Sequence, residues 1–585
     1  MLRLRGSLLV GACAGVITCG CGSPEAEIDP LPLPTPVAWP EPVPFVPAGS
    51  FVAAHPEAFE RISGWATHVE GPVEERPDVG HRGALGVGNG WVFAMFGVGD
   101  PLNSMHSMVG PTYDRTDRFF GDYAVGLGPA GTSEPPAFDE EWAARSLSAP
   151  VVMTRGRLGS LVLDTVDFAP TTTDALERSC LLRVLTVRNT GATASEPQDV
   201  VVMPANANDV TALPSGALRE EVEGRALQSG FVGFDGDNEG EVLRWSLDPL
   251  AAGAEAQAVL QHCALPSDTS TVMPSPDVHA LLDATATAYR GWERELVQVE
   301  LPDRMMADFI DGMKLTMKTQ TTATGASCPM SNYTRTWARD NIGPTLAWLA
   351  LGAHDDVRAM MDYLYGAVLV GGDLQNSYDA DLDLSDLPPA PDWDAMPPLG
   401  GRVAAETPSY MVWMYGALYA HAGASSRAEQ RWGFLRRCLF AQDFGPDLLL
   451  PFTGDETYRG AMNITFGLGI EYGHADKSYS ANSSLLWLGA AHHFERLAAA
   501  LGRFDDVERV RAQYVAVESA LIDSYRLRDG CLSTHVSRET GERWPAPYED
   551  VALKATWAGW LDPDDELAGQ INTCHFNRLR SAPGQ

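Results

Sequence analysis

The spacing of apolar residues changes once along this chain, near residue 276, and this change limits the folds open to it. Before it, short apolar runs such as Leu161–Phe168 and Leu181–Val187 alternate with turn residues. After it, apolar residues recur three or four positions apart, as in Met414, Tyr415 and Leu418. Side chains repeat with a period of two in strands and 3.6 in helices. The sequence therefore predicts a β domain followed by an α domain.

Residues 51–270 are predicted to form a large antiparallel β-sandwich of the supersandwich type. Further short runs, Trp91–Phe96 and Val200–Met203, fit strands. Gly88–Gly90, Asn189–Gly191 and Asp235–Asp237 separate the runs, and such Asn-Gly and Asp-Gly segments supply the positive φ angles of tight turns. Many short strands with turn signals between them favour a sandwich.

The rest of the chain is predicted to be helical. Residues 271–301 hold a linker helix, because Val278–Arg290 has helical spacing, and residues 302–585 form an α domain. Short connections there alternate with long ones rich in acidic and aromatic residues, so we expect helix hairpins whose long loops gather at one end and build a pocket. The expected helices lie near 302–322, 342–352, 355–369, 407–422, 426–442, 483–501, 505–525 and 551–560.

The first fifty residues have the features of an export signal and a spacer. Residues 1–21 combine two early arginines with a short apolar run and then small residues around Cys19 and Cys21. This ending resembles the bacterial lipobox, so lipidation at Cys19 or Cys21 is expected; an ordinary cleaved signal is the alternative. Residues 22–50 are a proline-rich, extended linker. The expected location is the cell envelope, as a periplasmic or outer-surface lipoprotein, or outside the cell. Contact with a membrane is expected only through that lipid.

Charge and cysteine spacing exclude several functions. The net charge of −35 argues against nucleic acid, because a phosphate backbone needs a basic surface. The six cysteines beyond the signal lack CxxC spacing, so zinc is not expected, and they are either buried thiols or disulfides. The acidic run Asp379–Asp386 resembles a calcium loop, but Leu384 occupies the place of its turn glycine. No metal and no cofactor are expected, and the oligomeric state is not predicted.

The segment Ser331–Asp340, which precedes an apolar helix, combines the groups that a sugar needs. Trp337 offers a flat apolar face, Arg339 offers a fork of donors, and Asp340 offers a charged acceptor. A ligand with both hydroxyls and apolar ring faces suits this set. The alternative is a helix start, with Asp340 as the N-cap and Arg339 in a surface ion pair.

A second segment with candidate catalytic residues lies in a later long loop. Asp455 and Glu456 are adjacent carboxylates between Phe452 on one side and Tyr458 and Arg459 on the other. An apolar wall raises the pKa of a carboxyl group by desolvation, as a general acid requires. One of the two carboxylates is therefore a candidate acid and the other an orienting partner. The alternative is a Gly-Asp-Glu turn with both carboxylates in water.

Three motifs, in this order along the chain, resemble those of the six-hairpin glycosidases. Leu85–Gly90 resembles the GNG turn in the sandwich of disaccharide phosphorylases. Trp337–Asp340 resembles the W-x-R-D of bacterial glucoamylases, and Glu406–Pro408 is similar to their E-x-P. The resemblance implies a sandwich, a linker helix and an (α/α)6 toroid. It also implies that Arg339 and Asp340 hold a terminal sugar, that Glu406 lines the same pocket, and that Glu456 is the general acid.

The resemblance further implies inverting hydrolysis of a glycosidic bond, with a neutral carbohydrate as substrate. Glu456 would protonate the glycosidic oxygen while a second carboxylate activates water. The family has an aromatic-Glu-Glu pattern where this chain has Gly-Asp-Glu. Its base precedes the last of twelve helices, and only about eight are visible here, with little periodicity after Trp560. We therefore expect an incomplete toroid, with the base beyond Gln585.

Other roles remain open from the sequence. Glu471, Asp476 or Glu549 could replace the missing base, and Asp550 could line the pocket. A phosphorolytic enzyme is the second hypothesis, because disaccharide phosphorylases share the same domain order. An inactive protein that binds glycans at the cell surface is the third.

Overall fold

The computed structural model divides into two compact units, residues 1–42 and 43–585, and only the second contains described residues. The expected signal and its cysteines therefore lie outside the described part, as does the lipidation predicted there. The described residues are 45–71, 85–97, 104–113, 119–205, 208–233, 237–239, 241–268, 275–328, 335–399, 406–451, 478–526, 531–533, 535–544 and 555–581.

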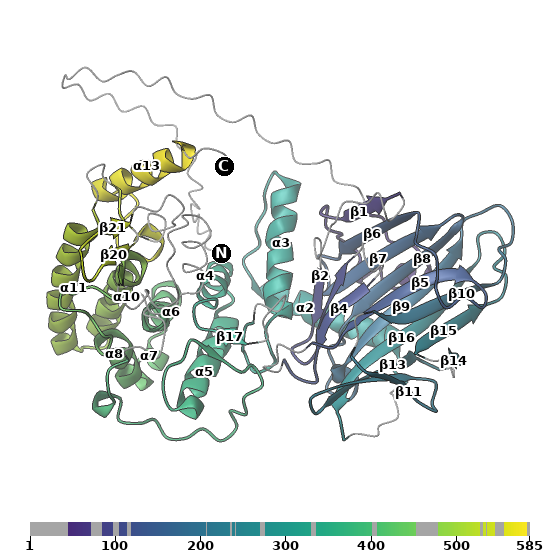
Figure 1. Ribbon diagram of the computed structural model, residues 1–585, viewed down its shortest axis with the longest axis horizontal. Coiled ribbons are helices and arrows are strands. Elements are labelled where there is room, and N and C mark those ends of the chain that lie inside the picture. The colour runs from purple at the N-terminus through teal and green to yellow at the C-terminus, as the bar shows by residue number, and fades with distance from the viewer. Residues whose placement is uncertain are drawn as a thin grey trace, which may run out of the picture. The chain divides into compact units, whose positions relative to one another are not determined.

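Two antiparallel sheets make up the N-terminal part of the second unit (Figure 1). The strands of the nine-stranded sheet are, in spatial order, β1 (Thr67–Glu70), β6 (Glu140–Arg145), β7 (Val151–Leu158), β8 (Leu161–Phe168), β9 (Cys180–Asn189), β16 (Glu255–Pro266), β13 (Arg225–Phe231), β12 (Leu218–Val222) and β11 (Val210–Ala212). Those of the seven-stranded sheet are β14 (Asp237–Glu239), β15 (Val242–Leu247), β10 (Gln198–Ala205), β5 (Asp122–Pro129), β4 (Ser104–Val109), β3 (Phe93–Gly97) and β2 (Leu85–Gly88). An antiparallel β domain therefore precedes the helices, as predicted.

The alternation along β8 shows how the nine-stranded sheet is buried on both faces. Leu161 and Leu163 belong to the core between the sheets, whereas Val166 and Phe168 pack on the opposite face. This period of two is what a strand requires. One predicted turn differs: the segment after Asn189 does not close a hairpin, because β9 and β10 belong to different sheets.

A buried ion pair lies on the inward face of β8 and β9. Arg183 is opposite Asp167 in the strand register, and its Nε donates to Asp167 Oδ1 at 2.7 Å. Both side chains are 0% exposed. Thr165 Oγ1 donates to the other carboxylate oxygen at 2.6 Å, and the Arg183 guanidinium lies 5.1 Å from the ring centre of Phe96 in the opposite sheet. The charges are thus enclosed between the sheets and satisfied by each other and by hydroxyl and aromatic groups.

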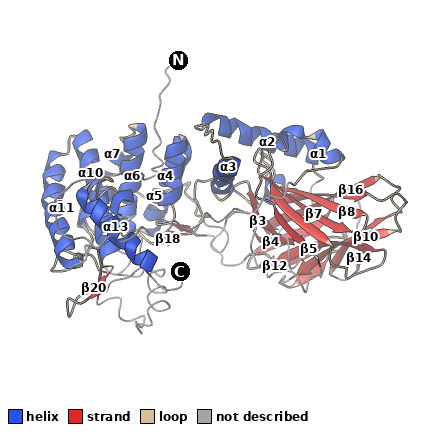
Figure 2. Ribbon diagram, turned by 90° about the horizontal axis from the view of Figure 1, so that it is seen from above, coloured by secondary structure: helices blue, strands red, loops and turns tan. Residues whose placement is uncertain are grey.

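The outer face of the nine-stranded sheet is covered by α1 (Ser50–Ala54) and the linker helix α2 (Val278–Glu295), as Figure 2 shows. Leu281, Leu282 and Ala286 of α2 pack with Phe168 of β8 in one apolar cluster. The helix begins at the N-cap Asp277, whose carboxylate accepts a bond from Ala280 N at 3.1 Å. The linker helix predicted from the apolar spacing is therefore present and amphipathic.

The helical part follows α2. Its helices are α3 (Arg304–Thr319), α4 (Ile342–Leu351), α5 (His354–Gly371), α6 (Thr407–Ala422), α7 (Ser426–Gln430), α8 (Trp432–Phe440), α10 (Ala481–Ala500), α11 (Phe504–Tyr525) and α13 (Glu566–Ser581). Short strands in its loops are β17 (Thr336–Trp337), β18 (Ser377–Tyr378), β19 (Ser478–Ser480), β20 (His535–Ser537) and β21 (Arg543–Trp544). Helix α6 packs against α4, α5, α8 and α10, so it lies in the middle of this domain.

Three helix predictions need correction. The helix expected at 426–442 is interrupted at Arg431, whose side chain bonds to Asp362 and to Tyr415 Oη. Within 551–560, only residues 555–557 are helical among those described, and the chain turns at Gly559 with φ +78°. Helix α13 was not expected, because its sequence is mostly polar; a disulfide from Cys574 to Cys531 ties it to the preceding loop.

The sequence left open whether the other cysteines are buried thiols or disulfides, and the structure contains both. Cys180 and Cys263 form a disulfide between neighbouring strands β9 and β16. Cys328 and Cys438 are buried thiols, and burial raises the pKa of both. A search of the described residues for helices that could cross a membrane finds none of sufficient length and apolarity.

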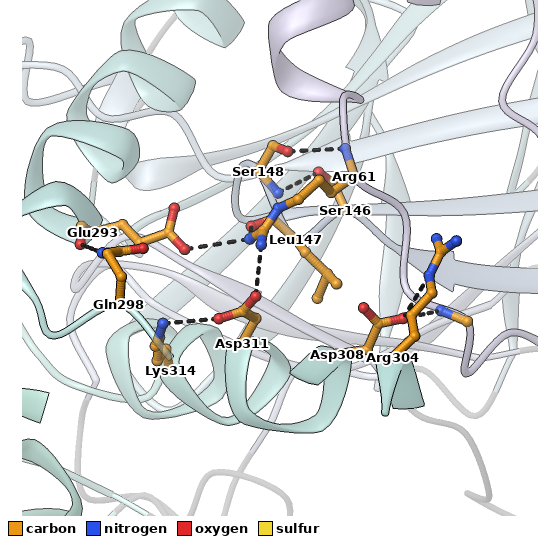
Figure 3. A network of polar contacts seen from close by, with 11 residues as sticks. Arg61, Ser146, Leu147, Ser148, Glu293, Gln298, Arg304, Asp308, Asp311 and Lys314 are labelled. Carbon is orange, nitrogen blue, oxygen red and sulfur yellow. Dashed lines mark hydrogen bonds and ion pairs between the residues drawn. The ribbon is translucent and has the colours of Figure 1, made fainter. Parts of the chain in front are cut away.

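Polar contacts join the sandwich to α2 and α3 (Figure 3). Arg61, which precedes β1, donates to Asp311 of α3 at 2.7 Å and to Glu293 of α2 at 3.3 Å. Lys314 pairs with the second oxygen of Asp311 at 2.8 Å. One arginine therefore connects three segments that are far apart in the sequence.

The GNG turn makes a second connection of this kind. Both polar atoms of the Asn89 side chain are bonded: its Oδ1 accepts from the backbone amides of Trp91 and Val92, and its Nδ2 donates to Pro170 O and Arg178 O at 2.8 Å. Gly90 has φ +90°, and a Cβ there would lie 2.6 Å from Ala323 N of the helical part. Only glycine tolerates both conditions. The turn thus has a structural role that its likeness to phosphorylases did not specify.

Close packing of α6 on α10 creates a pH-sensitive position. His493 of α10 lies against Gly416 of α6, where a Cβ would come within 2.4 Å of His493 Cβ. Burial, reinforced by the electrostatic effect of the nearby side chains His492, Arg496 and His421, lowers the pKa of His493 to about 4. In the unfolded chain a histidine titrates near 6.5. Between these values the unfolded state binds a proton that the folded state does not, so stability is lost as the pH falls.

We expect acidification from pH 7 to 4.5 to cost the wild type about 1–3 kcal/mol more stability than it costs His493→Gln. Urea denaturation of both proteins at the two pH values measures this difference. If the two proteins lost the same free energy of unfolding, a group other than His493 would be responsible for the loss of stability at low pH.

Candidate functional site

Helices α4, α6 and α10 begin at one common end of the helical part. Ala338 N, just before α4, donates to Asn376 O at 3.0 Å, and Asn376 Oδ1 accepts from Thr407 Oγ1 of α6 at 3.1 Å. Ser483 Oγ of α10 lies 3.5 Å from Glu406 Oε2 at the start of α6. These contacts define a surface, here called the pole, made by the N-terminal ends of the three helices and the loops before them.

Trp337 reaches the pole on a short two-stranded ribbon. Strands β17 and β18 pair so that Trp337 lies opposite Ser377. Arg335 fixes this ribbon, since its Nε donates to Ser377 Oγ at 2.8 Å and its guanidinium bonds to Asp379. Sequence reasoning overlooked Arg335, although it lies two residues before the motif. The long loops after α3 and after α5 are therefore joined at the pole.

Arg339 and Asp340 are half-exposed at the pole. Their side chains are 34% and 36% exposed, and Arg339 Nε lies 3.4 Å from Asp340 Oδ1. The alternative interpretation of Asp340 as N-cap is wrong, because Asn341 is the residue that precedes α4. Asn341 Nδ2 instead donates back to Trp337 O at 2.6 Å and Thr336 Oγ1 at 2.9 Å. Asn341 therefore holds the motif in place and leaves the Asp340 carboxylate accessible at the surface.

Glu406 is a buried acid at the start of α6. It is 3% exposed and precedes Thr407 and Pro408, and proline is tolerated in the first turn because its missing N–H would have no helical partner. The positive end of the helix dipole favours a negative charge at this position. Ser483 of α10 contacts the carboxylate. The structure thus brings Trp337, Arg339, Asp340 and Glu406 to one end of the domain.

The predicted acid segment starts and ends at the pole. Leu450 N donates to Ser484 Oγ at 3.1 Å, and Ser480 N donates to Leu450 O at 3.0 Å. Pro451 pairs with Tyr479 in an isolated bridge. Asp455, Glu456, Tyr458, Arg459, Glu471 and Asp476 lie outside the described residues, between Pro451 and Ser478. Glu549 and Asp550 also lie outside them.

A further loop joins the pole through β19. This strand pairs with β20, so the loop after α11 meets the segment before α10. The guanidinium of Arg538 lies 5.1 Å from the ring centre of Tyr479. Burial raises the pKa of Tyr479, although Arg538 opposes this shift. The phenol is therefore a neutral hydrogen-bond donor or acceptor at physiological pH.

The pole gathers side chains of several chemical kinds. It combines an indole, a guanidinium and two carboxylates, which together offer an apolar face, donors and acceptors. The described residues contain no group of three or more acidic, histidine or cysteine side chains placed to hold a metal ion.

Solved structures with a similar arrangement of elements include several carbohydrate-active enzymes. A bacterial glucoamylase complexed with acarbose matches with 11% identity and a TM-score of 0.47, over 78% of this chain and 69% of that one. A putative kojibiose phosphorylase from the human microbiome matches with 7% identity and a TM-score of 0.44, over 74% and 66%. A rhamnosidase from Klebsiella oxytoca with rhamnose bound matches with 12% identity and a TM-score of 0.36, over 79% and 80%.

Sequence comparison finds no match to a protein-family model and none to a curated protein. The structures named above include a glucoamylase and a putative phosphorylase, the two kinds of enzyme to which the motifs were compared. This chain spans about two thirds of the length of the first two. At these identities and TM-scores, the likeness transfers neither substrate nor mechanism to this chain.

Proposed function

We propose that this chain is a carbohydrate-active enzyme that cleaves a terminal glycosidic bond of an oligo- or polysaccharide with inversion, within an (α/α)6-type domain. The observation that supports this most is the convergence of Trp337, Arg339, Asp340 and Glu406 at the ends of three helices. These residues come from segments about seventy positions apart in the sequence. The alternative interpretation, in which Trp337–Asp340 only begins a helix, does not require these residues to lie near Glu406.

Each pole residue has a role that its chemistry supports. Trp337 stacks on the apolar face of the terminal sugar. Arg339 donates to its hydroxyls, and Asp340 accepts from them through a charge-assisted bond. Glu406, which is buried, accepts from a hydroxyl that reaches the base of the pocket. Held in this way, the glycosidic oxygen is presented to the adjoining loops.

Glu456 is proposed as the general acid and Asp455 as its orienting partner. The support is that both described ends of their segment, Pro451 and Ser478, are anchored next to the start of α10. Tyr458 and Arg459, in the same segment, are proposed to bind substrate. The candidates within this chain for the carboxylate that activates water are Glu471, Asp476 and Glu549, which belong to loops joined to the pole at their described ends.

We expect Asp340→Asn to lower kcat/KM about 5- to 30-fold, because a neutral hydrogen bond is weaker than a charge-assisted one by about 1–2 kcal/mol. Initial rates on the best cleaved glycoside measure this change. The matched control is Asp355→Asn on α5, where the carboxylate is 94% exposed, and its rate should stay within twofold of the wild type. Equal rates in all three proteins would remove the pole from the mechanism.

The chain is also proposed to be exported and lipidated at Cys19 or Cys21. If so, cells that express it should incorporate labelled palmitate into the protein, and either Cys19→Ala or Cys21→Ala should abolish the label. Loss with one substitution alone identifies the acylated cysteine. An unlabelled wild type that is released into the medium would indicate an ordinary cleaved signal instead.

A further inference from the structure

A cavity of about 300 Å³ lies where the sandwich, the linker helix and the helical part meet. Its walls come from the GNG turn, from α2, from the end of α3 with the loop after it, and from the first turns of α5. None of the pole residues lines it. Ligand sites occur preferentially at domain junctions, and this volume is at the small end of their range. It is enough for a single sugar ring.

An ion pair and an indole form one side of this cavity. Lys318 Nζ donates to Asp356 Oδ1 at 2.7 Å, and Trp292 Nε1 donates to Asp356 Oδ2 at 2.8 Å. The ammonium lies 5.0 Å from the ring centre of Trp292. Asp356 is 16% exposed and Lys318 is 39% exposed, so the pair extends from the wall to the solvent. The indole orientation is thereby fixed before any ligand arrives.

The walls of the cavity also carry threonine hydroxyl groups. Thr285 Oγ1 donates to Leu281 O at 2.8 Å, and Thr321 Oγ1 donates to Met317 O at 2.8 Å. A hydroxyl has one donor and two acceptor positions. Both donors are used on helix carbonyls. Thr285 Oγ1 also accepts from Thr171 N at 2.9 Å, so one of its two acceptor positions is already used, whereas no bond accepted by Thr321 Oγ1 is found among the described residues. Lys318 has three N–H donors, of which the described bond to Asp356 uses one.

We infer that this junction cavity is a second saccharide site, which takes one neutral monosaccharide unit with the ring face against Trp292. Charge decides the class of ligand. Lys318 and Asp356 neutralise each other. An anionic ligand that contacted the Lys318 ammonium would therefore also lie close to the Asp356 carboxylate, which would repel it. Sugar hydroxyls each donate and accept, which matches the N–H donors of Lys318 and the threonine oxygens. The site is independent of the proposed cleavage at the pole.

A pair of substitutions on α2 tests this inference. Ala288 lines the cavity and is exposed on α2, whereas Ala284, one turn earlier, is also exposed but does not line it. Ala288→Trp should fill the cavity and Ala284→Trp should not, while both keep the helix. Isothermal titration calorimetry with glucose, galactose and mannose then reports binding without any need for turnover.

We expect Ala288→Trp to weaken binding of the preferred monosaccharide at one site at least tenfold, while Ala284→Trp leaves both sites unchanged. Asp356→Asn should weaken the same site, and Asp340→Asn should affect only the other. If Asp340→Asn abolished monosaccharide binding and Ala288→Trp left it unchanged, the sugar would bind at the pole, and the inference of a second site would be wrong. Binding of inorganic phosphate in place of sugars, lost in Ala288→Trp, would overturn the choice of a neutral ligand. If no glycoside is cleaved but the Ala288→Trp effect is present, the proposed function fails and this site stands.

Discussion

Glu456→Gln should lower kcat on the cleaved glycoside by about 10²–10⁴-fold while the Kd of the uncleaved sugar changes less than twofold. The amide keeps the size of the side chain but has no acidic proton to give to the leaving oxygen. General acid catalysis typically contributes a factor of this size. Pre-steady-state or initial-rate kinetics give kcat, and calorimetry gives the binding constant.

Two further variants make this result specific. Glu508→Gln changes an exposed acid on α11 and should behave as the wild type. Asp455→Asn tests the neighbouring carboxylate, and a smaller loss than that of Glu456→Gln is expected for an orienting partner. If Asp455→Asn abolished turnover and Glu456→Gln did not, the roles of the two residues would have to be exchanged.

The second large effect concerns stability. Asp167→Asn should lower the free energy of unfolding by about 3–5 kcal/mol, because it leaves the Arg183 charge enclosed between the sheets without its counter-charge. The asparagine keeps the shape of the side chain but carries no charge, and both positions are 0% exposed to solvent. Urea denaturation followed by tryptophan fluorescence measures the change.

The control for this variant is another carboxylate–arginine pair of the same sheet. Glu140 pairs with Arg157, but their side chains are 24% and 38% exposed. Solvent screens such a pair, so Glu140→Gln should cost less than about 1 kcal/mol. If both variants lost the same small amount of free energy of unfolding, the charge of the buried pair would contribute little to stability.

Local patterns predicted much of the fold. The run Leu161–Phe168 coincides with β8, and the helix predicted at 407–422 coincides with α6. Both have an uninterrupted period and clear ends. The break at Arg431 was missed because it depends on Asp362, which lies in another helix. Helix α13 was missed because its burial is limited to a few positions, such as Ala568 and Ile571.

The candidate site shows the same division. Trp337, Arg339 and Asp340 were proposed from their chemistry and spacing, and Glu406 from the likeness of Glu406–Pro408 to the E-x-P motif. Arg335 and Asn341 were missed as supports, because their partners lie across a strand pairing or in the backbone, which residue types do not reveal. The junction cavity was missed for a similar reason, since its walls come from segments that are far apart in the sequence.

Cleavage of a glycosidic bond is the central claim, and product analysis tests it most directly. The purified chain is incubated with a panel of α- and β-linked oligosaccharides, with and without inorganic phosphate, and products are followed by NMR. We predict a free terminal sugar of inverted anomeric configuration, released at the same rate in both conditions. Release of a sugar phosphate only when phosphate is present would instead establish phosphorolysis. Binding of the oligosaccharides without any cleavage would contradict the claim.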